Sequence, residues 1–341
     1  MNTNQLEETA QAMVTPGRGI LAADQGASFI GGWLESLGHA TSDNTLVQYR
    51  TMIFGTPQLS DHISGIILMG DVLAQQSDDG TPLLELITQQ GIMPGLSPGT
   101  GQEVLAGTQG EVVPIGLEGL RERLAKFRDL GFRFTKWRAP LKVGPGLPTS
   151  YAADANAYTL GQFAALSQEA GLVPIVEPEV EMLGDHTVDR HFDVSEWFLR
   201  KVFQTLYEQG VYLEGMILKT NMIVSGKDCP EQVSVDEVAD MTLKCLRRTV
   251  PAAVPGIAFL SGGQSDYHAT AHLNAMNAAG TQPWTLSFSY GRALQRPAMT
   301  AWAGKVDQID AGRNAMYQCA KLNGMAAQGS CSDEDLAWFA A

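Results

Sequence analysis

Short apolar segments alternate with helical segments along almost the whole of this 341-residue chain. Apolar runs of about four to eight residues bounded by turn residues predict buried strands, whereas apolar residues at helical spacing predict amphipathic helices. We expect strands at residues 19–23, 62–69, 91–96, 132–138, 172–179, 216–219, 257–261 and 285–289. We expect helices at residues 43–53, 82–90, 117–129, 151–170, 194–208, 234–248, 266–278 and 309–326, with one more at 2–14 before the first strand.

This alternation favours an α/β fold in which a parallel sheet closes into a (β/α)₈ TIM barrel. An open, doubly wound sheet is the alternative, and it would call for a glycine-rich dinucleotide turn after an early strand. The first strand instead ends in Asp24-Gln25-Gly26. Because no linker or charge block interrupts the rhythm, we expect a single domain over residues 1–341, with an extra N-terminal helix and a C-terminal tail at 328–341.

The formal net charge of −14 argues against nucleic acid or an anionic membrane as a partner, because the field of the protein would repel both. An anionic substrate would need a local basic patch. No apolar run reaches membrane-spanning length, and the first residues do not resemble a signal peptide. We therefore expect a cytoplasmic protein.

Charged side chains collect at the ends of several predicted strands. They are Asp24 after the first strand, Lys136 and Arg138 on the fourth, Glu177 and Glu179 on the fifth, and Lys219 on the sixth. Side chains two apart on a strand share a face, and catalytic groups of this fold come from the carboxyl ends of its strands. Burying such groups is costly unless they are paired, so we expect them to form a functional site.

The last two strands end in the sequences SGGQS (261–265) and SYGRA (289–293). Loops in these positions commonly bind phosphate in this fold. Ser261, Gly262 and Gly263 would let backbone amides approach an anion, and Arg292 would add a charged contact. We therefore predict a phosphate site beside the charged strand ends.

These residues suit Schiff-base chemistry on a phosphorylated ketone. A lone lysine would more often extend its ammonium to solvent, but the other strand ends favour Lys219 as a partly desolvated nucleophile toward a carbonyl. Lys136 beside it would help to keep Lys219 neutral, and Glu177 would move the protons of carbinolamine dehydration. Asp24 would take the hydroxyl proton released when the carbon–carbon bond breaks.

From its first helix to about residue 325 the chain resembles the class I fructose-bisphosphate aldolases. The segments that carry the resemblance are KWR (136–138), VPIVEPE (173–179), LEGMILK (213–219), LRRTVP (246–251), FLSGGQS (259–265) and FSYGRAL (288–294). The resemblance implies a (β/α)₈ fold, a homo-oligomer, no metal or other cofactor, and a sugar phosphate as substrate. The implied reaction cleaves a ketose 1-phosphate such as fructose 1,6-bisphosphate to glycerone phosphate and an aldehyde.

The resemblance also implies roles for individual residues. The Schiff-base lysine falls on Lys219, the general acid/base on Glu177, the supporting glutamate on Glu179, the second lysine on Lys136 and the aspartate on Asp24. The ketose 1-phosphate site falls on Ser261, Gly262, Gly291 and Arg292, and Arg138 is a further candidate for substrate binding.

The chain departs from this family at the other end of the substrate. Where the family has two serines, a basic pair and a lysine for the distal phosphate, this chain has Gly26, Phe29, Gly32, Trp33 and Ser97. Phe29 and Trp33 should make that end of the pocket more apolar. An alternative is therefore an aldolase for a ketose 1-phosphate without the distal phosphate, similar to fructose 1-phosphate.

Two other function classes remain open. A metal-dependent lyase would use His268 and His272, which stand four residues apart on one helix, although exposed surface histidines are the expected case. His186 and His191 are expected in a loop. A non-enzymatic sugar-phosphate-binding protein is the other, less favoured alternative, because every residue needed for the Schiff base is present.

Overall fold

A closed barrel of eight parallel strands forms the centre of the computed structural model, which describes residues 2–38 and 42–340. The strands are β1 (Gly19–Ala22), β2 (Ile63–Leu68), β3 (Met93–Leu96), β6 (Phe134–Leu141), β7 (Val173–Val180), β8 (Ile217–Thr220), β9 (Gly256–Phe259) and β10 (Thr285–Tyr290). They follow one another around the barrel in chain order, and β10 pairs with β1 to close it. The predicted (β/α)₈ barrel is confirmed.

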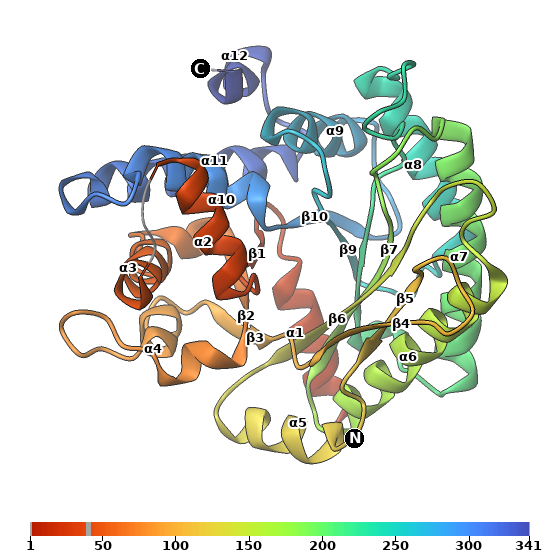
Figure 1. Ribbon diagram of the computed structural model, residues 1–341, viewed down its shortest axis with the longest axis horizontal. Helices are drawn as coiled ribbons and strands as arrows, with labels where there is room; N and C mark the ends of the chain where they lie inside the picture. The colour runs from red at the N-terminus through yellow and green to blue at the C-terminus, as the bar shows by residue number, and fades with distance from the viewer. Residues whose placement is uncertain (1, 39–41, 341) are drawn as a thin grey trace.

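Helices surround the barrel (Figure 1). Those that the sequence predicts are α1 (Thr3–Met13), α3 (Asp43–Phe54), α4 (Leu83–Thr88), α5 (Leu120–Asp129), α6 (Ser150–Glu169), α7 (Val188–Glu208), α8 (Val235–Thr249), α9 (Asp266–Ala278) and α11 (Ile309–Ala326). Within the described ranges, no helix combines the length and the apolar character needed to cross a lipid bilayer.

Several elements were not predicted from the sequence. They are α2 (Ala27–Ser36), α10 (Arg292–Trp302), α12 (Asp333–Ala337) and the hairpin of β4 (Gly101–Val104) and β5 (Val112–Ile115). Short 3₁₀ turns lie at η1 (Leu59–Asp61), η2 (Gly70–Ala74), η3 (Leu213–Gly215), η4 (Val306–Gln308) and η5 (Trp338–Ala340). The segment predicted as a tail therefore contains α12, whose Leu336 is buried.

Helix α7 begins six residues earlier than predicted, because the side chain of Thr187 accepts the amide of Arg190 and caps the first turn. This places His191 inside the helix, so the expectation that it is a loop residue is wrong. Its ring is fully buried, with Nδ1 accepting from the amide of Val224 (3.0 Å) and Nε2 3.2 Å from the carbonyl of Val180. His186 does lie in the preceding loop.

At the end opposite the charged residues, the barrel interior is apolar and is closed by α1. One buried cluster joins α1 to inward-facing side chains of the strands: Leu6, Ala10, Met13, Val14, Ile20, Ala22, Ile67, Phe134, Val173, Ile175, Ile217 and Ala258. Glu7 of α1 also accepts from the hydroxyl of Tyr212 at 2.5 Å. Burial of each large aliphatic side chain contributes about 1.5–3 kcal/mol, so this plug stabilises the end of the barrel opposite the charged residues.

Successive side chains of β6 point alternately into the barrel and out toward the helices. Trp137 points outward, as predicted, and stacks on Phe163 of α6 with ring centroids 5.3 Å apart. Phe134 points inward, and its ring occupies the space that side chains at Gly65 and Gly95 on the neighbouring strands would need. In the floor of the barrel, the apolar end closed by α1, the ring of Phe134 thus fills the space left by Gly65 and Gly95.

We expect Gly95→Ala to destabilise the protein by about 1–3 kcal/mol, because an added methyl group would overlap the ring of Phe134. The midpoint of urea unfolding measures this change. Gly32→Ala in α2 is the control, since no heavy atom lies within 4 Å of the added carbon. Phe134→Leu combined with Gly95→Ala should recover part of the loss, and strictly additive effects would contradict the proposed overlap.

Candidate active site

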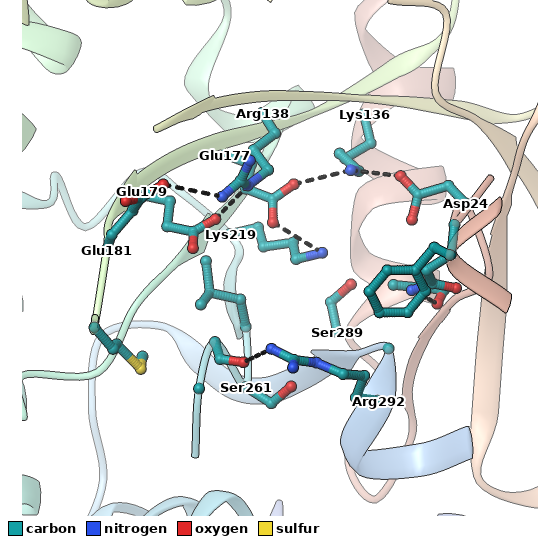
Figure 2. Close-up of a pocket in the computed structure, with 18 of the residues that line it drawn as sticks. Asp24, Lys136, Arg138, Glu177, Glu179, Glu181, Lys219, Ser261, Ser289 and Arg292 are labelled. Carbon is teal, nitrogen blue, oxygen red and sulfur yellow. Dashed lines mark hydrogen bonds and ion pairs between the residues drawn. The ribbon is translucent and has the colours of Figure 1, made fainter. Parts of the chain in front are cut away.

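A cavity of about 410 Å³ opens at the carboxyl ends of the barrel strands. Its wall includes all of the candidate site residues: Asp24, Lys136, Arg138, Glu177, Glu179, Lys219, Ser261, Gly262, Gly291 and Arg292. Figure 2 shows the charged side chains of the strand ends on one side of the cavity, with Ser261 and Arg292 on the other. The structure thus brings together residues that lie as far apart in the sequence as positions 24 and 292.

Lys219 and Glu177 are the most buried of the charged residues in this group. On β8, Ile217 points into the apolar floor, so the side chain two residues later points into the barrel above it. Lys219 is only 3% exposed, and its Nζ lies 3.0 Å from Oε1 of Glu177 on β7. A single amine is thereby held against a carboxylate at the base of the cavity.

Lys136 lies between two carboxylates. Its Nζ is 2.5 Å from Oδ2 of Asp24 and 3.1 Å from Oε2 of Glu177. Burial alone would lower the pKa of Lys136, but Asp24 and Glu177 together raise it above its ordinary value. Lys136 is therefore a permanent cation at neutral pH.

The two carboxylates that face Lys136 are ionised as well. Burial raises the pKa of Asp24 and of Glu177, but the ammonium groups of Lys136 and Lys219 outweigh it and hold both values below their ordinary range. Figure 2 shows the resulting row of alternating charge from Asp24 through Lys136 and Glu177 to Lys219. In the ligand-free site, Glu177 is thus poised to accept a proton.

Arg138 forms a second charged group with Glu179 and Glu181. Its Nε bonds to Glu179, and its Nη2 lies 3.9 Å from Oε1 of Glu181. Glu179, the supporting glutamate that the resemblance implies, therefore contacts an arginine. Glu181 was missed because the predicted strand ended at residue 179. Its two-residue spacing from Glu177 and Glu179 was the available signal.

Two loops and a helix start form the opposite wall. Gly262 has a φ of +55°, and a side chain there would meet Sδ of Met182 at 2.5 Å. Gly291 caps α10, and the guanidinium of Arg292 donates to the carbonyl of Gly262 at 2.6 Å. The first turn of α10 therefore adds free backbone amides to the basic side chain, an arrangement that suits an anion.

Ser289 and Gln25 also line this cavity, although neither was proposed from the sequence. Ser289 is 1% exposed, and its hydroxyl has no hydrogen-bond partner among the described residues. Gln25 donates to the carbonyl of Ala22 at 2.9 Å and fills the space beside Gly291. Serine and glutamine at strand ends are too common in loops for the sequence to single them out.

The distal end of the cavity differs in part from expectation. Phe29 of α2 lines it and is 46% exposed, as predicted. Trp33 does not belong to the described lining, and it packs one helical turn away against the core, edge-on to Phe29 with centroids 6.3 Å apart. The expectation that Trp33 lines the pocket is wrong, because an unpredicted helix turns its side chain elsewhere. Ser97 likewise lies outside the described wall.

The histidines of the metal hypothesis lie outside this cavity. His268 is exposed, but His272 is buried and its Nδ1 lies 2.6 Å from Oε1 of Gln264, which corrects the expectation of two surface histidines. Within residues 2–38 and 42–340, no group of three or more histidine, cysteine, aspartate or glutamate residues is arranged to hold a metal ion.

Comparison with known proteins agrees with this geometry. The family model described as "Fructose-bisphosphate aldolase class-I" matches residues 5–338. A "Probable fructose-bisphosphate aldolase class 1" of Xanthomonas axonopodis pv. citri (strain 306) is 48% identical over 330 residues, which cover 96% of this chain and 99% of the relative. The "Fructose-bisphosphate aldolase" of Drosophila melanogaster is 44% identical over 328 residues, covering 96% and 91%.

A solved structure shows the same likeness in three dimensions. Fructose-bisphosphate aldolase from Plasmodium falciparum, determined in complex with TRAP and a small-molecule inhibitor, superposes with a TM-score of 0.95. The two sequences are 38% identical, and the match covers 96% of this chain and 95% of the other. With a family model, full-length relatives and a solved structure in agreement, the chain belongs to the class I fructose-bisphosphate aldolase family.

Proposed function

We propose that this protein is a lyase that cleaves fructose 1,6-bisphosphate to glycerone phosphate and glyceraldehyde 3-phosphate, and catalyses the reverse condensation, through a Schiff base on Lys219. The observation that carries the proposal is the buried amine of Lys219, 3.0 Å from Glu177, at the base of a cavity whose opposite wall suits a phosphate. No metal or other cofactor is needed, because the iminium itself withdraws electrons from the bond that breaks.

The substrate enters with its C1 phosphate on the loop and helix wall. Ser261 and the amides near Gly262 and Gly291 contact the phosphate oxygens, and Arg292 supplies the charge. Binding the phosphate there directs the neighbouring C2 carbonyl toward the strand side of the cavity, where Lys219 lies.

Carbinolamine formation and dehydration need a proton acceptor and donor beside the nucleophile. Glu177 is ionised before substrate binds, so it first accepts a proton from Lys219 and frees the amine lone pair for attack on C2. A second proton moves from the attacking nitrogen to the C2 oxygen and gives the neutral carbinolamine. Glu177 then returns the first proton to this C2 hydroxyl, which leaves as water as the iminium forms. The cation of Lys136 compensates the charge of Glu177 through this exchange.

Cleavage follows from the iminium. The C3–C4 bond breaks, its electron pair moves to the enamine, and the C4 hydroxyl proton passes to a base as the aldehyde forms. Asp24 is that base, because it is ionised and is held at the cavity wall by Lys136, 2.5 Å away. Protonation and hydrolysis of the enamine release glycerone phosphate and restore Lys219.

We further propose that residues 1–341 form one domain with a C-terminal tail at 328–341, and that the protein is a cytoplasmic homo-oligomer. Support for one domain comes from strands that run from residue 19 to residue 290 in a single closed sheet. Exposed aromatic side chains on α6 and α7, at Tyr151, Tyr158 and Tyr207, support a contact between copies.

Lys219→Ala should abolish covalent labelling by borohydride in the presence of glycerone phosphate, because Lys136, the other amine beside Glu177, is kept protonated by Asp24 and Glu177. Mass spectrometry of the intact protein measures the label, and EDTA in the buffer tests the proposal that no metal takes part. Lys126→Ala on α5 is the matched control and should label normally. A label that persists in the Lys219→Ala protein, for instance on Lys136, would contradict the assignment.

Glu177→Gln should lower kcat by about 10²–10⁴-fold, the usual cost of losing a general acid/base, while the ketose phosphate still binds. Stopped-flow turnover and an independent binding titration separate the two effects. Glu181→Gln is the control on the same strand end, because Glu181 contacts Arg138 and not Lys219. An unchanged kcat would remove Glu177 from the mechanism.

The distal phosphate should contribute less than the C1 phosphate. At the distal end the chain places Phe29, and Glu181 adds a carboxylate beside Arg138. We expect kcat/KM for fructose 1,6-bisphosphate to exceed that for fructose 1-phosphate by less than about 100-fold, since one lost contact to a charged group costs about 1.5–3 kcal/mol. A larger preference, measured at fixed ionic strength, would show that other groups have rebuilt the distal site.

A further inference from the structure

A second cavity, of about 220 Å³, lies on the other side of the phosphate loop. It is bounded by the segment after β8, the start of α8, the loop before α9 and the first turns of α9. The described lining consists of Met182, Val224, Ser225, Lys227, Gln232, Val233, Val238, Gly263, Gln264, Ser265, His268 and His272. Only Met182 and Gly263 are shared with the reaction cavity.

The charge of this cavity is opposite to that of the protein. The chain carries a net charge of −14, yet the described lining contains a lysine and two histidines and no aspartate or glutamate. Lys227 is exposed at the rim, and within the described chain its ammonium forms no ion pair. An anion is therefore the one charged ligand that this wall favours.

One buried polar group in the wall lacks a partner. Ser225 is 5% exposed, and its hydroxyl has no hydrogen bond to any of the described residues. Buried hydroxyl groups are nearly always paired with protein or with a bound molecule. Ser225 lies two residues before Lys227 in the same wall, so both side chains can contact the charged group of one ligand.

The apolar part of the lining is formed by Val224, Val233, Val238 and Met182. Burial lowers the pKa of His272 to about 4, so its ring is neutral at physiological pH and adds surface without charge. A ligand that fills the space therefore needs an apolar body as well as a charged head.

Backbone contacts hold the cavity in shape. The amide of Lys227 donates to the carbonyl of Met182 at 2.9 Å, and Nε2 of Gln232 donates to the carbonyls of Gly226 (2.9 Å) and Cys229 (2.8 Å). Ser265 caps α9 by accepting the amide of His268 at 3.1 Å. Because these bonds fix the backbone of Lys227, the side chain of Gln232 and the start of α9, a ligand would enter a pre-formed site.

We propose that this cavity binds a small organic anion, with its phosphate or carboxylate head at Lys227 and Ser225 and its apolar body against the valines. The site is distinct from the reaction cavity, although its occupant would contact the loop that holds the substrate phosphate. The proposal does not depend on the reaction catalysed.

Phenyl phosphate is a suitable probe, and calorimetry on the full-length Arg292→Ala protein measures its Kd after the arginine has been removed from the phosphate-binding wall of the reaction cavity. Lys227→Ala in this background should raise the Kd about tenfold or more, the loss expected for a charge-assisted contact. Val233→Asp should do the same by placing a carboxylate in the wall. Lys126→Ala, which removes the same charge on the distant α5, should leave the Kd within about twofold.

Two further ligands test the two parts of the proposed site. Inorganic phosphate lacks the apolar body and benzyl alcohol lacks the charge, so each should bind at least about tenfold more weakly than phenyl phosphate. Equal binding of inorganic phosphate would mean that the valine wall is unused. The proposal is overturned by that result, by no binding in the Arg292→Ala background, or by equal effects of Lys227→Ala and Lys126→Ala.

Discussion

The row of alternating charge from Asp24 through Lys136 and Glu177 to Lys219 is the interaction on which the site depends. Each of these groups would be costly to bury alone, and each is acceptable because its neighbour carries the opposite charge. Removing one partner of such a buried pair costs about 3–5 kcal/mol, so the four residues are coupled. The same pairing keeps Asp24 and Glu177 ionised and Lys136 protonated, which sets the protonation states from which the proposed reaction starts.

The barrel makes this row possible because its strands present every second side chain to the interior. On β6, β7 and β8 the inward positions change from Phe134, Ile175 and Ile217 at the floor to charged groups one step above. The apolar layer below excludes water from one side, and the open cavity above admits the substrate. Strand periodicity thus places a hydrophobic floor and an ionic network in direct contact.

Regular, strongly apolar strands and the residues that end them could be predicted from the sequence. Helix α10 was not predicted, because a proline in the interior of a segment normally argues against a helix. Pro297 nevertheless lies near the middle of α10. Trp33 was misplaced because its position depends on α2, which was not predicted. Glu181 was overlooked because it follows β7, which ends at Val180, one residue beyond the predicted end. His272 could not be recognised as buried, because its environment comes from Gln264 and the wall of the second cavity, which are brought beside it only by the fold.

The plug formed by α1 has a consequence for the order of assembly during synthesis. Several of its contacts are with residues made much later: Thr9 accepts from Arg133, Glu7 accepts from Tyr212, and Leu6 packs where Gly215 leaves room for it. An isolated helix of 11 residues is marginal in water, so this segment, which is made before those partners, must wait without a stable structure. At about 5–20 residues per second, that wait lasts roughly 10–40 s. The helix is therefore among the last elements to dock, and the floor of the barrel closes only after the strands that it contacts have formed.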